Sequence, residues 1–560
     1  MDKETRSKPA GTASAQLLQR ALASHQQGRL AEAEALYREI LARDPEHFDA
    51  LHLSGVIAYQ QGRYDAAVES IGRALMRERT QAAPYSNLGL TLLAQGRHEA
   101  ALACFVQALA LQPDQAGSHN NRGNALRGLK RNQEALACYD RALALQPDFA
   151  LAHSNRGNIL QDLQRHEDAL AGYDAALGLQ PNYAEAHNNR AHALRRLNRL
   201  DEALASCERA LQIRPEYAEA HNNRGNILQD LGQHETALAS YARSLALRPD
   251  YAEAHLNDGL CRLSLGDFER GWRAYEWRWA SPTHRSARRD FTQPLWLGQF
   301  SLAGKTLLLH AEQGLGDTLQ FCRFAPQLAA QGARVLLEVQ APLAGLLASL
   351  AGVSRVVVQG EPLPDFDYHC PLLSLPHGLR LSLAHLPSTV LPYLAVDPVR
   401  AAQWRARLAA CPRPWVGVSW SGNPTHVNDH NRSLPLAALD DLWLRPGTVI
   451  AVQTRMASAE RDAFRAMGGI DPAELLGDFA DTAALLSCVD HVLTVDTASA
   501  HLAGAMALPT TLLLPFNADF RWLIGRDYSP WYPTLRIARQ ARMGDWSDAV
   551  AQALASLPSA

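Results

Sequence analysis

The sequence lacks a membrane span, a secretion signal and a cysteine framework. No run of apolar residues reaches the roughly 20 positions that a helix needs to cross a bilayer. The N-terminal stretch from Met1 to Lys8 is polar and has no apolar region of a signal peptide. The eight cysteines are scattered and form no CxxC pair, a distribution typical of reduced thiols. We therefore expect a cytoplasmic protein.

The sequence also lacks an excess of either charge. It has 54 basic and 57 acidic residues, which give a formal net charge of −3. Such a balance argues against binding to nucleic acid or to a membrane surface through bulk charge. At 560 residues the chain is too long for one hydrophobic core, so several domains are expected.

Residues 14 to about 285 repeat with a period of 34, the length of a tetratricopeptide unit, and resemble that family. Two positions hold small residues, and a third holds a large side chain such as Phe105 or Tyr139. Small residues let two helices pack closely, while large ones fill the groove between them. The pattern predicts about eight helix pairs in a right-handed superhelix with a concave inner face. The small positions are Gly55, Gly89, Gly123, Gly157, Gly225 and Gly259, and Ala67, Ala101, Ala135, Ala169, Ala203 and Ala237.

Asparagine recurs at one position of the first helix of six units, although it is a mediocre helix former. A side-chain amide both donates to and accepts from a peptide backbone, so this ladder could hold an extended chain without reading its sequence. It resembles the asparagine ladder in the tetratricopeptide domain of O-linked N-acetylglucosamine transferase, where the acceptor protein lies. The alternative is a solvated polar face copied by repeat duplication. The ladder consists of Asn87, Asn121, Asn155, Asn189, Asn223 and Asn257.

A histidine ladder runs beside the asparagines, at His119, His153, His187, His221 and His255. Packed helices of successive repeats lie roughly 10 Å apart, whereas zinc binds nitrogen atoms at about 2 Å. One metal ion therefore cannot gather ligands from several repeats. We expect these histidines at contacts between repeats.

The array ends on an aromatic segment that contains Trp272, Trp277 and Trp279. A free end of a repeat array would be polar. The tryptophans therefore predict that the end of the array docks onto the next domain.

The second half of the chain alternates short apolar strands with helical segments. This alternation predicts two Rossmann-like α/β lobes with parallel sheets. We place a polar tail at residues 1–13, the repeat array at 14–285, a linker at 286–303, and the two lobes at 304–395 and 396–560. Strands are expected at residues 306–310, 335–339 and 356–358 in the first lobe, and at 415–419, 449–453, 492–495 and 511–514 in the second.

One turn in the second lobe carries the pattern of an anion site. A buried strand is predicted at residues 491–495, and a helix follows that stops at Pro509. Free N–H groups and the positive end of the helix dipole meet in the turn, where small side chains let a phosphate come close. The alternative is an ordinary capped strand–helix unit without a ligand. The turn consists of Asp496 as the expected N-cap, Thr497, Ala498 and Ser499.

The stretch from Asp496 to Ala503 resembles the donor-side motif of heptosyltransferase-like glycosyltransferases of the GT-B fold, and the likeness spans most of residues 300–545. In that family the turn holds the diphosphate and sugar of a nucleotide-sugar, which implies that the turn and His501 bind the donor. Gly316 and Asp317, after the first strand, resemble the acceptor-side loop of the family. The resemblance implies that Asp317 is the general base.

The loop with Gly314 and Gly316 also permits a dinucleotide-binding interpretation. Glu338 ends the second strand, about where an acid that binds ribose is expected. However, Leu319 replaces the third glycine of the fingerprint, and Asp317 would put a negative charge beside a pyrophosphate. An NAD-dependent enzyme is therefore the weaker alternative.

Further polar residues follow the strands of the second lobe, and ligands of open α/β sheets bind at those ends. Ser421, Asn423 and Gln453 are expected to bind the donor. Arg432 is expected at its phosphates because guanidinium matches phosphate geometry; the alternative is an arginine on a solvated loop. Arg521 either walls the cleft or belongs to the core.

These features predict a tetratricopeptide superhelix fused to a GT-B module, which resembles bacterial protein glycosyltransferases, including those that modify flagellin. The resemblance implies inverting transfer of a sugar from a nucleotide-sugar to a Ser or Thr hydroxyl of an acceptor protein held by the array. No carboxylate pair resembles the DxD metal site of other glycosyltransferases, so neither a metal nor a cofactor is expected. The alternative is a scaffold whose transferase fold has lost activity and only binds partner proteins.

Overall fold

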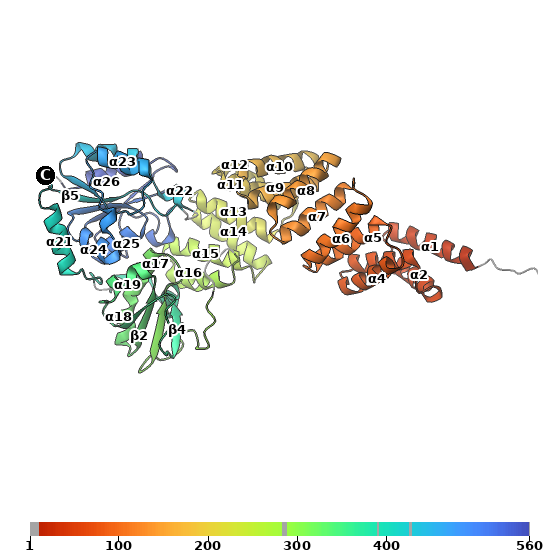
Figure 1. Ribbon diagram of the computed structural model, residues 1–560, viewed down its shortest axis with the longest axis horizontal. Coiled ribbons are helices and arrows are strands. Elements are labelled where there is room, and N and C mark those ends of the chain that lie inside the picture. The colour runs from red at the N-terminus through yellow and green to blue at the C-terminus, as the bar shows by residue number, and fades with distance from the viewer. Residues whose placement is uncertain (1–9, 283–287, 389–390, 425–427, 559–560) are drawn as a thin grey trace, which may run out of the picture. The chain divides into compact units, whose positions relative to one another are not determined.

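The computed structural model describes residues 10–282, 288–388, 391–424 and 428–558. Most of the tail predicted at residues 1–13, and the first two residues of the predicted linker, lie outside these ranges. The chain divides into two compact units, residues 1–227 and 228–560. The division falls inside the helix Ala218–Asp230 of the repeat array, which is labelled α13 in Figure 1.

Sixteen helices, in antiparallel pairs, fill the described part of the array and confirm the eight predicted pairs. The predicted packing of small against large residues is also confirmed. A Cβ atom added to Gly123 would lie 2.6 Å from the Tyr139 ring, so only glycine lets these helices approach so closely. The helices are α1 (Ala10–Gln26), α2 (Leu30–Arg43), α3 (Phe48–Gln60), α4 (Tyr64–Arg77), α5 (Ala82–Ala94), α6 (His98–Leu111), α7 (Ala116–Gly128), α8 (Asn132–Leu145), α9 (Ala150–Asp162), α10 (His166–Leu179), α11 (Ala184–Arg196), α12 (Leu200–Ile213), α13 (Ala218–Asp230), α14 (His234–Leu247), α15 (Ala252–Leu265) and α16 (Phe268–Tyr275).

The first lobe is a parallel sheet with the strand order β3-β2-β1-β4. The three strands predicted here are confirmed, and β4 is additional. This strand has only four residues and ends on Pro371, so it gives little periodic signal. The elements are β1 (Thr306–His310), α17 (Leu315–Phe321), α18 (Ala325–Ala330), β2 (Arg334–Val339), α19 (Ala341–Leu347), β3 (Val353–Val358), β4 (Tyr368–Pro371) and α20 (Leu375–Gly378).

The second lobe is a parallel sheet with the strand order β6-β5-β7-β8-β9. Its four predicted strands are confirmed, and the edge strand β9 is additional. The elements are α21 (Pro398–Leu408), β5 (Trp415–Ser419), α22 (Asp429–Arg432), the 3₁₀ segment Leu436–Leu444, β6 (Thr448–Ala451), α23 (Ser458–Ala466), α24 (Phe479–Leu486), β7 (His491–Val495), α25 (Ala498–Ala505), β8 (Thr510–Leu514), the 3₁₀ segment Phe520–Trp522, β9 (Leu535–Arg539) and α26 (Ser547–Ala555). The predicted class, an all-α repeat superhelix followed by an α/β module with two parallel sheets, is therefore confirmed.

The strands of the second sheet are apolar on both faces because each face is covered. Val416 and Val418 of β5 pack in a core that includes α26, whereas Trp415 packs in the core on the opposite face. Alternate residues of a strand point to opposite faces, so helices on both sides bury the whole sheet.

The aromatic end of the array packs into the same core as the two lobes, as predicted. Trp272 is only 1% exposed and meets the rings of Phe321 and Phe520, which belong to the first and second lobes. Trp277 instead stacks on His255 of α15, with 4.0 Å between ring centroids. The last helices of the array are thus part of the core of the second compact unit.

Candidate functional site

The predicted anion turn lies between β7 and α25. Thr497, rather than Asp496, is the N-cap, because the backbone is still extended there with φ −137° and ψ 175°. The Thr497 side chain makes no capping hydrogen bond to the described residues. Ala498 is half-buried and Ser499 is buried at the start of the helix. The first N–H groups of α25 thus lack a cap from this side chain, while the helix dipole gives them positive character.

Asp496 holds a carboxyl group whose protonation is perturbed. Burial, and then the negative charge of Asp519, raise its pKa to about 6. Arg432 and Arg521 act in the opposite direction but do not cancel these effects. The backbone carbonyl of Asp496 accepts a hydrogen bond from Arg432 Nη1 at 3.1 Å.

Arg432 lies at the carboxyl edge of β5 and β7. Its Nε donates to Asp429 Oδ1 at 3.2 Å, and its side chain is 16% exposed. The loop after β5 passes close to both side chains: a Cβ atom on Gly422 would lie 2.5 Å from Asp429 Oδ1 and 2.7 Å from Arg432 Nη2. Arg432, which we predicted to bind the donor phosphates, therefore lies beside the Asp496 turn, and part of its side chain is open to solvent.

The other predicted donor residues surround the same edge. Gln453 Oε1 accepts from the backbone N–H groups of Trp420 and Ser421, and its Nε2 donates to Ser421 Oγ at 3.0 Å. Gln453 thus fixes the chain after β5 and is itself buried. Asn423 is exposed, and its Oδ1 accepts from Arg455 at 3.4 Å.

Asp317 lies in the first turn of α17, in the first lobe. Its Oδ2 accepts from the backbone N–H of Gly314 at 2.8 Å, and its Oδ1 accepts from Arg521 Nη2. Arg521 comes from the second lobe and is 8% exposed. Its Nη1 donates to Asp519 Oδ1 at 2.7 Å, while its Nε has no partner among the described residues. Asp317 is thus paired with an arginine 204 positions away in the chain.

The two predicted loops meet at Gly316. A Cβ atom there would lie 2.7 Å from His501 Cδ2 and 3.6 Å from the Cα of Ala498. The structure therefore brings the loop of Asp317 against the first turn of α25. We use the name charged cluster for the five ionisable side chains gathered here: Asp317, Arg432, Asp496, Asp519 and Arg521.

His501 is buried between the lobes rather than open to solvent. Its Nδ1 lies 3.1 Å from the Tyr532 hydroxyl, and its ring stacks on Trp522 with 5.0 Å between centroids. Burial and then the charges of Arg521 and Arg323 lower the pKa of His501 far below its ordinary value. His501 is therefore a neutral side chain at neutral pH, and in the described structure it packs α25 against α17.

Sequence reasoning did not identify Asp519 and left Arg521 undecided. Both follow β8, as the predicted donor residues follow β5, β6 and β7, so strand-end position is a signal that could have found them. The pairing of Arg521 with Asp317 has no local signal, because it joins two lobes.

Glu338, the acid of the dinucleotide alternative, is engaged elsewhere. It is the penultimate residue of β2, is 2% exposed and pairs with Arg289. A carboxylate that binds ribose would have to be open to the ligand, so this contact weighs against that alternative.

The asparagine ladder connects successive repeats. The side chains of Asn155, Asn189 and Asn223 each donate from Nδ2 at 2.9 Å to an asparagine of the preceding repeat. Asn87 makes the equivalent contact with His52 at 2.9 Å, and Asn121 Oδ1 accepts from its neighbour Asn120 at 3.2 Å. The ladder residues are half-buried, and each amide has four hydrogen-bonding positions.

The histidine ladder also has a structural role at the junctions of repeats. Each Nε2 lies 2.8–3.0 Å from the carbonyl oxygen of the proline six residues earlier, which lies at the end of the preceding unit. The described residues contain no group of three or more His, Cys, Asp or Glu side chains that could hold a metal ion.

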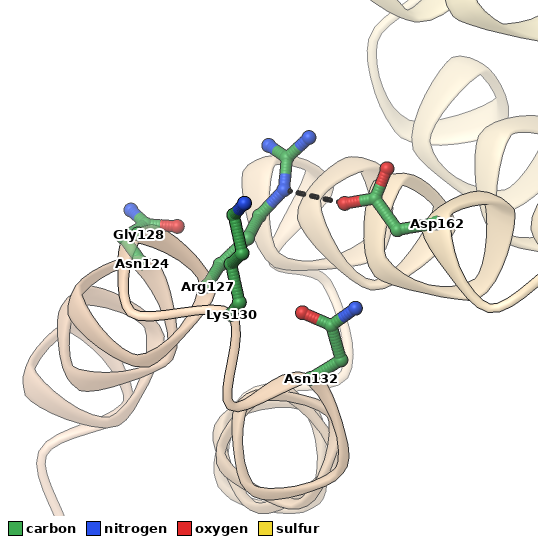
Figure 2. Close-up of a pocket in the computed structure, with 6 residues that line it drawn as sticks. All are labelled: Asn124, Arg127, Gly128, Lys130, Asn132 and Asp162. Atoms are coloured by element: carbon green, nitrogen blue, oxygen red, sulfur yellow. Dashed lines mark hydrogen bonds and ion pairs between the residues drawn. The ribbon is translucent and has the colours of Figure 1, made fainter. Parts of the chain in front are cut away.

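A separate hollow of about 590 Å³ lies at the ends of α7 and α9 and the start of α8 (Figure 2). It is open, and none of the ladder residues lines it. Arg127 and Asp162 face each other across it and form an ion pair at 3.1 Å. The lining residues are Asn124, Arg127, Gly128, Lys130, Asn132 and Asp162.

Comparisons with known proteins identify the repeats. Models of the tetratricopeptide repeat match residues 18–87, 86–150, 184–217 and 218–251. The protein FlbA of Caulobacter vibrioides is 26% identical over 312 residues, which are 51% of this chain and 52% of FlbA. The chain thus spans about half the length of this curated relative.

No helix among the described residues is long and apolar enough to cross a membrane.

Solved structures of repeat proteins are similar to parts of this chain. A tetratricopeptide repeat protein from Parabacteroides merdae is 17% identical, with a TM-score of 0.38, and covers 45% of this chain and 99% of its own. YrrB, described as a TPR protein with an unusual peptide-binding site, is 26% identical, with a TM-score of 0.28, and covers 33% of this chain and 96% of its own. The matches to the family models show that the chain contains tetratricopeptide repeats, a fold whose concave surfaces commonly bind peptides or proteins. An α/β module that is compatible with an enzyme follows the repeats.

Proposed function

We propose that this protein is an inverting, metal-independent glycosyltransferase that moves a sugar from a nucleotide-sugar to a Ser or Thr hydroxyl of an acceptor protein. The observation that carries the proposal is the contact at Gly316, which sets Asp317 of one lobe beside the N-terminus of α25 in the other. An anion site and a carboxylate base on facing lobes are what such a transfer requires. Flagellin is one candidate acceptor.

The donor diphosphate would bind at the turn of Thr497, Ala498 and Ser499. Backbone N–H groups at the start of α25 supply donors, and the helix dipole favours negative charge. Arg432, held at 3.1 Å from the carbonyl of Asp496, supplies a guanidinium at the same edge. The same groups would stabilise the charge of the departing phosphate, so the reaction would need no metal ion.

Asp317 would accept the proton of the acceptor hydroxyl. An ionised carboxylate has about four lone-pair positions, and the contacts with Gly314 and Arg521 use one on each oxygen.

The acceptor chain would lie along the asparagine ladder. The contacts between repeats use one donor of Asn155, Asn189 and Asn223, and the other amide positions could bind a peptide backbone. The last ladder residue, Asn257, lies on α15, which packs against the 3₁₀ segment Phe520–Trp522 that carries Arg521. The ladder thus ends on a helix next to the charged cluster.

Thermal shift with UDP, GDP, ADP and CMP tests the donor site. Arg432→Gln should weaken the nucleotide that binds by about 10- to 100-fold, because a hydrogen bond to a charged group contributes about 1.5–3 kcal/mol. Arg413→Gln is the matched control: Arg413 also pairs with an aspartate, Asp490, but precedes β5 at the opposite edge of the sheet.

The control should bind like the wild type. If none of the four nucleotides raises the unfolding temperature of the wild type, the transferase proposal fails and the scaffold alternative gains support.

We also propose a cytoplasmic location, which the eight free cysteine thiols support.

A further inference from the structure

The ion pair between Asp317 and Arg521 is built from two separate segments, and an aromatic ring lies close to each partner. Phe321 ends α17, four residues after Asp317. Phe520 immediately precedes Arg521, whose guanidinium lies 4.4 Å from the centre of that ring. The positions of these two rings therefore help to set the position of the ion pair.

Trp272, from the last helix of the repeat array, lies against both rings. Its ring meets Phe321 edge to face, with 5.7 Å between centroids and an angle of 88°. It meets Phe520 in the same way, at 5.6 Å and 81°. The indole N–H has no hydrogen-bond partner among the described residues. Trp272 therefore acts by shape and packing alone.

The same helix end also holds the loop that leads to Asp317. The Tyr275 hydroxyl accepts from Gln313 Nε2 at 2.9 Å. Arg278, whose side chain is fully buried, pairs with Glu312 at 3.0 Å. Two residues of the loop are thus attached to the end of the array before the chain enters α17.

The segment that carries Arg521 is attached to the array as well. The backbone N–H of Ile524 donates to the carbonyl of Ser264 at 3.0 Å. Asn517 Nδ2 donates to the carbonyl of Asp230 at 2.8 Å. Both partners of the ion pair therefore lie on segments that the last repeats hold from one side.

We infer that Trp272 is a positioning residue that aligns Asp317 with Arg521. Through Trp272, the end of the repeat array would set the geometry of the site between the lobes. The effect on turnover rests on the proposed function. The effect on the two segments does not, because it follows from packing. Displacement of a catalytic group by about 1 Å can lower a rate by about 100-fold.

The test compares Trp272→Phe and Trp272→Ala with Trp277→Phe in the full chain. Trp277 is the matched control, because it belongs to the same aromatic segment but stacks on His255 and not on the two phenylalanines. Hydrogen exchange followed by mass spectrometry should show faster exchange in residues 314–321 and 519–523 of both Trp272 variants, with β5 unchanged. Trp277→Phe should leave these segments as in the wild type.

Turnover provides the second measurement. Trp272→Phe should lower kcat by roughly 10- to 100-fold while KM for the nucleotide-sugar stays the same. In an Asp317→Asn background the same change should cost less than about twofold, because residues that act through one another are not additive. A general packing defect would give equal losses in both backgrounds.

Three results would overturn the inference: unchanged exchange in both segments of Trp272→Phe, an equal effect of Trp277→Phe, or additive losses of turnover. If the wild type transfers no sugar at all, the proposed function fails, and the exchange measurement still decides whether Trp272 holds the two segments. Should Trp272→Ala fail to fold, Trp272→Phe carries the test, because it keeps an aromatic ring at the position.

Discussion

Changing Asp317 to asparagine should separate its role as a base from its role in the ion pair. Asp317 accepts hydrogen bonds on two different oxygens, from Gly314 and from Arg521, whereas asparagine has one acceptor oxygen. The oxygen should turn toward Arg521, which is buried, while the exposed Gly314 N–H turns to water. Loss of one such bond and of the charge beside Arg521 should lower the free energy of unfolding by about 1–3 kcal/mol.

Turnover should fall much further than stability. Removal of a general base lowers the rate by roughly 10²–10⁴, and Asp317→Asn keeps the size of the side chain. The affinity for the nucleotide-sugar should change by less than about twofold. The proposed donor groups lie on the other lobe, and they bind the donor rather than remove the acceptor proton. The rate is measured in single turnovers, binding by thermal shift and unfolding by calorimetry.

Asp519→Asn is the matched control for the charge beside Arg521. Asp519 accepts from the backbone N–H of Arg521 at 3.0 Å and from its Nη1 at 2.7 Å, both on Oδ1. An asparagine can keep both bonds while it removes the same negative charge. Its turnover should fall by less than about 10-fold, below the range for loss of a general base.

The two possible failures have different meanings. If Asp317→Asn loses nucleotide affinity, Asp317 belongs to the donor site and the proposed mechanism is wrong. If it keeps wild-type turnover, another group is the base. The next residue to test is then Asp496, whose pKa of about 6 lies nearer to neutrality.

Three further predictions concern the ladder, the absence of a metal and the contact between the lobes. Alanine at all four of Asn121, Asn155, Asn189 and Asn223 should weaken acceptor binding, measured by calorimetry, and leave nucleotide affinity intact; unchanged acceptor binding refutes the ladder role. EDTA should not slow transfer, and a loss of rate that magnesium or manganese restores contradicts the donor site proposed here. Gly316→Ala should lower the free energy of unfolding by about 1–3 kcal/mol and reduce turnover, because its Cβ would lie 2.7 Å from His501; wild-type values for both refute the close contact.

The parts of the fold that the sequence predicts well are those with strong periodicity. The repeat array is marked by glycine and alanine at fixed spacing, and the rings of residues such as Tyr139 lie against those glycines. The strands β5 to β8 are buried on both faces and have continuous apolar runs. The edge strand β9 escapes prediction because Arg536 and Arg539 interrupt its apolar pattern.

The site is less predictable because its contacts depend on tertiary packing. Local sequence places Asp496, Arg432 and Gln453 after strands, and the structure gathers them at one edge of the sheet. The local sequence does not indicate that Gln453 binds the backbone after β5. Nor does it indicate that Arg521, in the second lobe, pairs with Asp317 in the first. The N-cap is one residue later than predicted because Thr497 continues the extended backbone of β7.

One side chain of the charged cluster, Asp496, should make the affinity for the donor depend on pH. A diphosphate bound at the neighbouring turn would add negative charge near Asp496, whose pKa the charge of Asp519 already helps to raise. Asp496 is the member that can respond, because its pKa is already raised to about 6 and each added negative charge favours its neutral form. Nucleotide binding should then take up a proton and tighten as the pH falls toward 6. The heat of binding would depend on the ionisation enthalpy of the buffer.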